Sequence, residues 1–212
     1  MIVAKEDLEI WARAALTAVP WVGGPAEIVY SGYRDRAADR VLDFFQELFE
    51  RFDDPAEVDA RLASSDRLDA AFGRAVRAAV ESGLQEKRKA LGRVVARALE
   101  DDAFIDGAEL LVATLASIEA PHVRAMTEIR HAVDQVKDAG AWPLRAAGAG
   151  HEIVMDVVSV GQRFDDLVIR TLGTLGLIYA GDMTDQWFVH DLTPRGYELL
   201  EFLEGDRAPR AT

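Results

Sequence analysis

The sequence predicts a mainly helical chain, with a helical bundle body and a C-terminal module that contains a short β-hairpin. Apolar residues recur every three or four positions through the first two thirds of the 212 residues. Near the C-terminus, the aromatic and β-branched run 187–190 favours a strand. The content of 50% hydrophobic and 29% charged residues is that of an ordinary folded chain, so disorder and low complexity are disfavoured.

The helices of the body follow from apolar stripes and their punctuation. One stripe steps by four, three and four residues through Val41, Phe45, Leu48 and Phe52. It predicts a helix over 26–52, which together with 5–19 and the intervening Pro20–Pro25 turn is expected to form a helical hairpin.

Further start and stop signals divide the rest of the body. Asp54 before Pro55 predicts a capped short helix to about Leu62, and Ser64-Ser65-Asp66 predicts the next start. The later apolar stripes occupy 68–80, 91–99, 111–118 and 126–136, and Pro121 suits the first turn of the last helix.

Small residues and turn formers concentrate in 139–143 and 146–150, which predicts a flexible stretch of about 138–150. We expect two domains. Residues 1–118 would form the helical body with its N-terminal hairpin, and residues 119–212 would form the C-terminal module.

The C-terminal module follows a helix, strand, turn, strand and helix order. The helix covers about 167–172 and runs into Leu177–Ala180, a turn is expected at Gly181–Asp182, and Thr193-Pro194 caps the last helix. This order, with Leu-Thr-Pro-x-Gly at 192–196 and the paired leucines at 199–200, resembles the end of a winged-helix module. The resemblance implies a recognition helix followed by a two-stranded wing.

A second resemblance covers more of the chain. The Pro-x-Val-Gly-Gly-Pro turn at 20–25, the helix with Gln85–Leu91 and the leucine-rich helix before Ala120-Pro121-His122 resemble a group of bacterial helical proteins of no known activity that also end in a winged-helix-like segment. This resemblance implies a bacterial origin and the architecture, and it implies no catalytic residue.

Charge argues against a polyanionic partner. The chain has 24 Lys and Arg against 37 Asp and Glu, a formal net charge of -13. Because nucleic-acid affinity comes largely from cations that displace counterions, DNA binding is disfavoured. The candidate contacts to DNA or to a protein partner are Arg163, Arg170, Thr171 and Thr174.

A basic stripe on one predicted helix allows two interpretations. It consists of Lys87, Arg88, Lys89, Arg93 and Arg97. It would either bind an acidic partner or pair with carboxylates of a neighbouring helix, and we favour pairing.

No constellation of residues indicates catalysis, so the sequence predicts a non-enzymatic protein with no cofactor and no metal. The chain has no cysteine, which excludes thiol nucleophiles and cysteine-ligated metals and suits a reducing compartment. The four histidines, at 122, 131, 151 and 190, have no partner at ligand spacing. The acidic pairs at 53–54, 101–102 and 165–166 each stand beside a predicted helix start, where carboxylates favour the positive end of the helix dipole.

These observations predict a cytoplasmic protein that acts through protein contacts, with a protein partner or as a homo-oligomer. The alternative is a dimeric winged-helix transcription regulator. A further alternative is a membrane-active stress or defence effector, since the small residues of the N-terminal hairpin permit close helix approach. A membrane partner is disfavoured, because Arg13 and Glu27 are costly in lipid.

Overall fold

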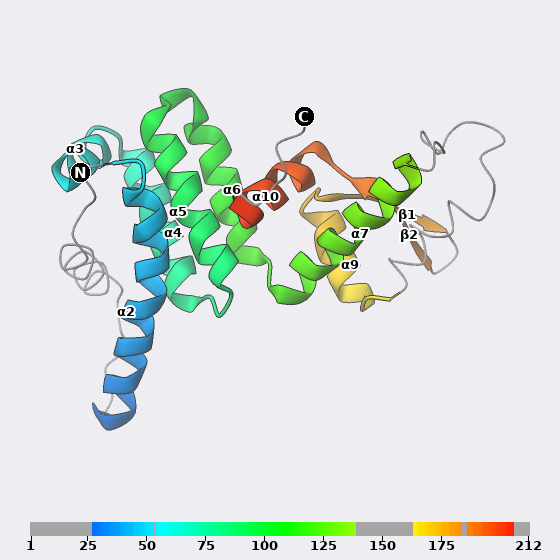
Figure 1. The fold of residues 1–212 in the computed structure, drawn as a ribbon, viewed down its shortest axis with the longest axis horizontal. Helices are drawn as coiled ribbons and strands as arrows, with labels where there is room; N and C mark the ends of the chain where they lie inside the picture. Colours follow the sequence, from blue (N-terminus) through cyan, green and yellow to red (C-terminus); the bar gives the residue numbers. More distant parts are fainter. Residues whose placement is uncertain (1–26, 53, 139–162, 184–185, 206–212) are drawn as a thin grey trace. The chain divides into compact units, whose positions relative to one another are not determined.

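The computed structural model describes residues 27–52, 54–138, 163–183 and 186–205 (Figure 1). These residues form eight α-helices, a 3-10 turn and two strands. In chain order they are α2 (Glu27–Phe49), α3 (Pro55–Ala63), α4 (Asp66–Glu81), α5 (Gln85–Glu100), η1 (Asp102–Phe104), α6 (Ile105–Ser117), α7 (Ala120–Asp138), α9 (Asp166–Thr174), β1 (Ile178–Met183), β2 (Gln186–Leu192) and α10 (Pro194–Glu204). The chain is therefore mainly helical with a two-stranded antiparallel sheet, as predicted.

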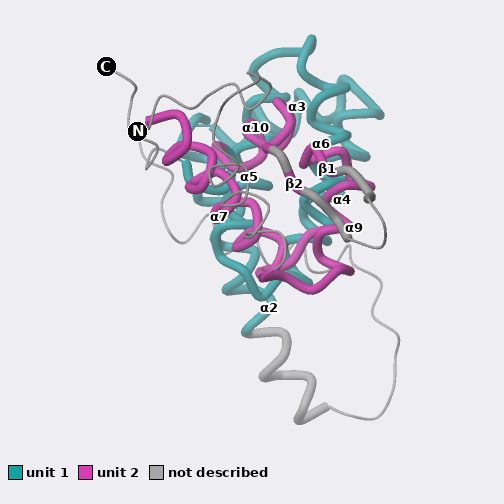
Figure 2. The backbone as a smooth tube through the Cα atoms, turned by 90° about the vertical axis from the view of Figure 1, so that its right-hand side faces the viewer, with its two compact units in different colours: residues 1–117, 202–212 teal, residues 118–201 magenta. Residues whose placement is uncertain are grey.

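The backbone divides into two compact units (Figure 2). Unit 1 contains 1–117 and 202–212, and unit 2 contains 118–201. The predicted division at 118/119 thus differs by one residue on the N-terminal side. It also differs at the other end, because the last turn of α10 groups with the first unit.

Two predicted segments fall largely outside the described residues. The first helix and the Gly-Gly turn of the N-terminal hairpin lie within 1–26, so the structure describes only the second helix, α2. The stretch predicted to be flexible lies outside the described residues from position 139 onward.

The core of unit 1 is built around α5, which packs against α2, α4 and α6. Phe44 and Phe45 of α2 are fully buried and form an aromatic cluster with Phe72. Gly92 of α5 lies so close to α2 that a Cβ atom there would stand 2.4 Å from the carbonyl oxygen of Phe44. Glycine therefore permits the close approach of these two helices.

Side-chain oxygens cap the starts of α3 and α4 at predicted positions. Asp54 Oδ1 accepts a hydrogen bond from Ala56 N at 2.9 Å, and the Ser65 side chain accepts from Leu68 N at 3.4 Å. Asp101 caps η1 in the same way as Asp54 caps α3. These acids and hydroxyls satisfy backbone N–H groups that have no partner within the helix.

In unit 2, α7 contacts both α9 and β2, and its apolar stripe is buried. The stripe contains the predicted Met126, Ile129, Val133 and Val136. Gly196 of α10 lies against the backbone at Leu177, where a Cβ atom would stand 2.1 Å from the Leu177 carbonyl oxygen.

The turn predicted at Gly181–Asp182 is wrong. Gly181 pairs with Phe188 and Asp182 pairs with Trp187, so β1 continues to Met183, which pairs with Gln186. The local turn preference of glycine and aspartate yields here to the hydrogen-bonded ladder between the strands.

Among the described helices, none combines the length and the apolar character that crossing a bilayer requires.

Candidate functional site

The basic stripe of α5 lies largely against carboxylates of α2. Arg88 Nη2 stands 2.6 Å from Asp43 Oδ2, Lys89 Nζ stands 3.3 Å from Glu47 Oε1, and Arg93 Nη1 stands 2.5 Å from Glu47 Oε2. Glu47 itself is only 8% exposed. These three cations are thus engaged inside unit 1 by carboxylates of a neighbouring helix.

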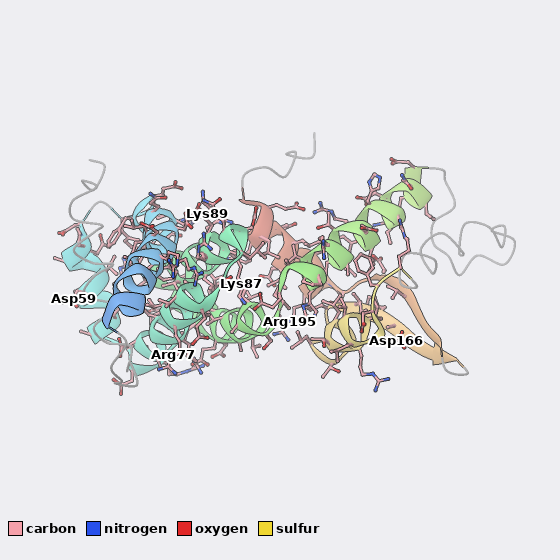
Figure 3. The ribbon with its side chains drawn as sticks, turned by 90° about the horizontal axis from the view of Figure 1, so that it is seen from below. Asp59, Arg77, Lys87, Lys89, Asp166 and Arg195 are labelled. Carbon is pink, nitrogen blue, oxygen red and sulfur yellow. The ribbon has the colours of Figure 1, made fainter. Side chains whose placement is uncertain are left out.

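The other two residues of the stripe are engaged within unit 1 as well. Lys87 is 2% exposed, and its Nζ donates to the carbonyl oxygen of Ala116 at 3.3 Å in the last turn of α6. In Figure 3, Lys89 extends outward while Lys87 lies among the helices. The Arg97 guanidinium stands 4.1 Å from the centroid of the Phe104 ring, a distance at which the ring face attracts a cation.

Three cations of the stripe, with Arg40 of α2 and Arg61 of α3, share one task, which is to donate to a carbonyl at a helix C-terminus. The last carbonyls of a helix have no partner within it and carry the negative end of the macrodipole, so a cation there is favourable. We call these residues the capping cations. They are Arg40 on Val80, Arg61 on Leu99, Lys87 on Ala116, Arg88 on Ser82 and Arg93 on Phe202. They serve the C-terminal ends of α4, α5, α6 and α10.

The candidate contact residues of the C-terminal module lie on or just before α9. Arg163 is ion-paired, with Nη2 at 3.5 Å from Glu128 Oε2 of α7. Arg170 and Thr174 are exposed on α9, and Thr171 is half-buried. The structure therefore brings Arg170, Thr171 and Thr174 together on one helix.

Acid and an apolar side chain occupy the start of the same helix. Asp165 Oδ1 caps α9 by accepting from Leu167 N at 2.8 Å, and Asp166 follows as an exposed residue (Figure 3). Leu167 is 70% exposed, and Tyr179 of the neighbouring strand β1 is 53% exposed. Sequence patterns did not single out either side chain, because exposure depends on tertiary packing.

A cluster that the sequence analysis missed joins three elements of unit 2. The Tyr197 hydroxyl donates to Asp191 Oδ1 at 2.7 Å, and Lys137 Nζ donates to the Tyr197 oxygen at 3.5 Å. Burial, followed by the hydrogen bond to Asp191, raises the pKa of Tyr197 above its ordinary value. The tyrosine therefore holds its proton and links α10, β2 and α7, a structural role for which the sequence carries no signal.

An exposed ion network joins α4 and α6. Arg67 Nη2 stands 2.8 Å from Glu109 Oε2 and also contacts Asp106, and Arg74 Nη2 stands 3.4 Å from Glu109 Oε1. The hydrogen bond from Arg67 lowers the pKa of Glu109. Because solvent and salt screen such pairs, they contribute little to stability.

The described histidines serve local structure. Glu119 N donates to His122 Nδ1 at 3.0 Å at the start of α7, and His131 Nε2 lies 3.0 Å from Gln135 Nε2. His151 and the side chain of His190 lie outside the described part. Within the described residues, no group of three or more His, Cys, Asp or Glu is arranged to hold a metal ion.

Comparison of the chain with protein-family models, with curated proteins and with solved structures gave no match.

Proposed function

We propose that the chain is a non-enzymatic protein that acts through protein contacts of a winged-helix-like unit 2, with α9 and β1 as the contact surface and a second copy as partner. The order α7, α9, β1, β2 and α10 supports the winged-helix interpretation. The observation that carries the proposal is the 70% exposure of Leu167 in the first turn of α9. Tyr179, 53% exposed on β1, adds a second apolar side chain from an element that contacts α9, and exposed apolar surface built by more than one side chain marks protein contacts.

Charge supports a protein in preference to DNA. Unit 2 has 7 Lys and Arg against 13 Asp and Glu, so it is poorer in cations than unit 1, which has 17 against 24. A recognition helix that meets phosphates needs cations and backbone N–H groups at its start. Here the Asp165 side chain already accepts from the Leu167 N–H, and Asp166 adds a second negative charge.

Light scattering of the full chain tests the proposal. The concentrations run from about 1 to about 100 µM, because weak interfaces form in this range. We expect a mass above the 23.3 kDa of one chain that increases with concentration. Leu167→Ser should shift the transition to higher concentration by tenfold or more, about 1.4 kcal/mol or more of association free energy.

Leu110→Ser is the matched control, because Leu110 is 57% exposed on α6 of unit 1. It should leave the assembly unchanged. A chain that stays monomeric throughout, or an equal response to both substitutions, overturns the proposal.

A second candidate function is DNA binding as a dimer, and the exposed Arg170 on α9 is the observation that favours it. Fluorescence anisotropy of a labelled duplex at roughly 20 to 200 mM salt tests it, because phosphate contacts make affinity fall steeply with salt. Arg77→Ala, at an exposed position on α4, is the control. Duplex binding that is weakened by Arg170→Ala and unchanged by Arg77→Ala would favour the regulator. We expect no binding at low salt.

A further inference from the structure

The helix α9 has one buried side and one exposed side. Ile169 and Leu172 are 1% and 0% exposed, and α7 and β1 contact the helix. Because successive helical residues are about 100° apart, the other side of α9 presents a stripe of about 100° along the helix. The residues of this stripe are Asp166, Leu167, Arg170 and Thr174, and all of them are exposed.

The two charges of the stripe have opposite signs and stand about one helical turn apart. Asp166 begins α9, Arg170 follows four positions later, and Leu167 lies between them along the helix axis. A rise of about 1.5 Å per residue separates the two charged positions by about 6 Å along the axis. The stripe therefore has an apolar residue between an acid and a base, as an interface with an apolar centre and a polar rim requires.

This order of residues is self-complementary under a two-fold rotation. When two copies of α9 lie antiparallel, with the axis midway between Asp166 and Arg170, the acid of each copy faces the arginine of the other. The same rotation brings the two Leu167 residues to about 3 Å from each other along the helix direction. A parallel pair of helices in register would instead place acid beside acid. The charge pattern thus fits a second copy in one orientation, which is the isologous arrangement of two-fold dimers.

The net charge of the chain makes local opposite charges necessary at such a contact. Two chains of formal charge -13 repel each other. At physiological salt the Debye length is about 8 Å, so distant charges are screened while charges that meet at the interface are not. Asp166 and Arg170 are also within reach of each other on their own helix. The antiparallel pair therefore joins both helices in one network of four charges, which sets their orientation.

We propose that the second copy docks through its own α9, antiparallel to α9 of the first chain. Asp166 of each chain then faces Arg170 of the other, and the two Leu167 side chains lie between these pairs. The inference rests on the proposed function, because it names the register of the same contact surface. Tyr179 of β1, which is 53% exposed, adds apolar area from a strand that contacts α9.

Charge reversal, followed by light scattering of the full chain, tests this register. Asp166→Lys and Arg170→Glu each bring like charges together, so either variant alone should need an about tenfold or higher concentration to assemble. An equimolar mixture of the two variants restores both opposite-charge pairs. The mixture should therefore assemble at the concentration that the wild type requires.

Two charge reversals on α4 are the matched controls, because they change the net charge by the same amounts at exposed positions. Asp69→Lys and Arg77→Glu should each assemble as the wild type does, alone and when mixed. Their behaviour separates a local pair from the effect of net charge on association.

A second pair of variants keeps the test decisive if circular dichroism shows that a reversed charge unfolds the chain. Asp166→Asn and Arg170→Gln each remove both pairs from their own dimer, whereas their mixture keeps one pair. The mixture should therefore assemble at a lower concentration than either variant alone. A chain that assembles and responds to Leu167→Ser, but whose mixtures assemble no better than the single variants, keeps the proposed function and overturns this register. A chain that stays monomeric overturns both.

Discussion

Unit 1 and unit 2 are both acidic, yet they use their charges differently. In unit 1 the capping cations bind helix carbonyls, and Arg88 and Arg93 also pair with carboxylates of α2. In unit 2 a neutral hydroxyl, Tyr197, stands between Asp191 and Lys137, and acid marks the start of α9. The comparison teaches that a basic stripe that is conspicuous in the sequence can be used inside the fold. By contrast, the exposed Leu167 lies on a helix where the sequence pattern did not single it out.

The largest expected effect tests whether each unit depends on a glycine that lets two backbone segments approach closely, Gly92 in unit 1 and Gly196 in unit 2. Gly92→Val and Gly196→Val should each destabilise the chain by about 3 kcal/mol, because the new side chain meets a backbone carbonyl. Urea unfolding gives the size. Hydrogen exchange should place the loss in α5 for the first and in α10 for the second.

Gly73→Ala and Gly173→Ala are the controls, since a Cβ atom at either position meets nothing within 4 Å. In mid-helix, Gly73→Ala should stabilise α4 by about 0.5–1 kcal/mol. Equal losses at Gly92 and Gly73 would contradict the close approach of α2 and α5.

A second prediction compares internal and surface cations within unit 1. Arg88→Met should cost about 2–3 kcal/mol, because it leaves the charge of Asp43, whose side chain is 15% exposed, with only the neutral Gln85 amide as donor and removes the cap on Ser82. Arg67→Met removes an exposed ion pair and should hardly change the urea midpoint. Equal decreases in the urea midpoint of the Arg88→Met and Arg67→Met variants would argue against the difference.

A third prediction concerns the hydroxyl of unit 2. Tyr197→Phe should cost about 1–2 kcal/mol at neutral pH through loss of the bond to Asp191. The raised pKa means that the folded chain holds this proton more tightly than the unfolded chain. Its contribution is therefore complete below the ordinary tyrosine pKa of about 10 and is lost as pH rises above it. Unfolding followed from about pH 9 to 11 should show a shallower fall for Tyr197→Phe than for the wild type.

The smallest expected effect tests the start of α7. His122 accepts the Glu119 N–H, the position that glutamine or glutamate fills in a capping box. His122→Ala should cost about 0.5–1 kcal/mol, whereas His122→Gln keeps an acceptor and should be close to neutral. Thermal unfolding of the two variants side by side measures the difference, and identical losses would exclude the capping role.

Within the described residues, the sequence alone predicted the α-helices, several of their starts and the order of elements in unit 2. Periodicity and capping act within a few residues, so Ser65 and the stripe from Met126 to Val136 were readable. The position of the β-turn was misjudged, because strand pairing outweighed the local preference at Gly181.

Only the tertiary structure decided what each charge does. Whether Lys87 is buried, whether Arg93 meets Phe202 at 109 positions and whether Leu167 is exposed depend on which helix lies opposite. The sequence gives the charge and the apolar character of each residue. Its contacts depend on tertiary packing, because the free energy gained by burial outweighs local preferences.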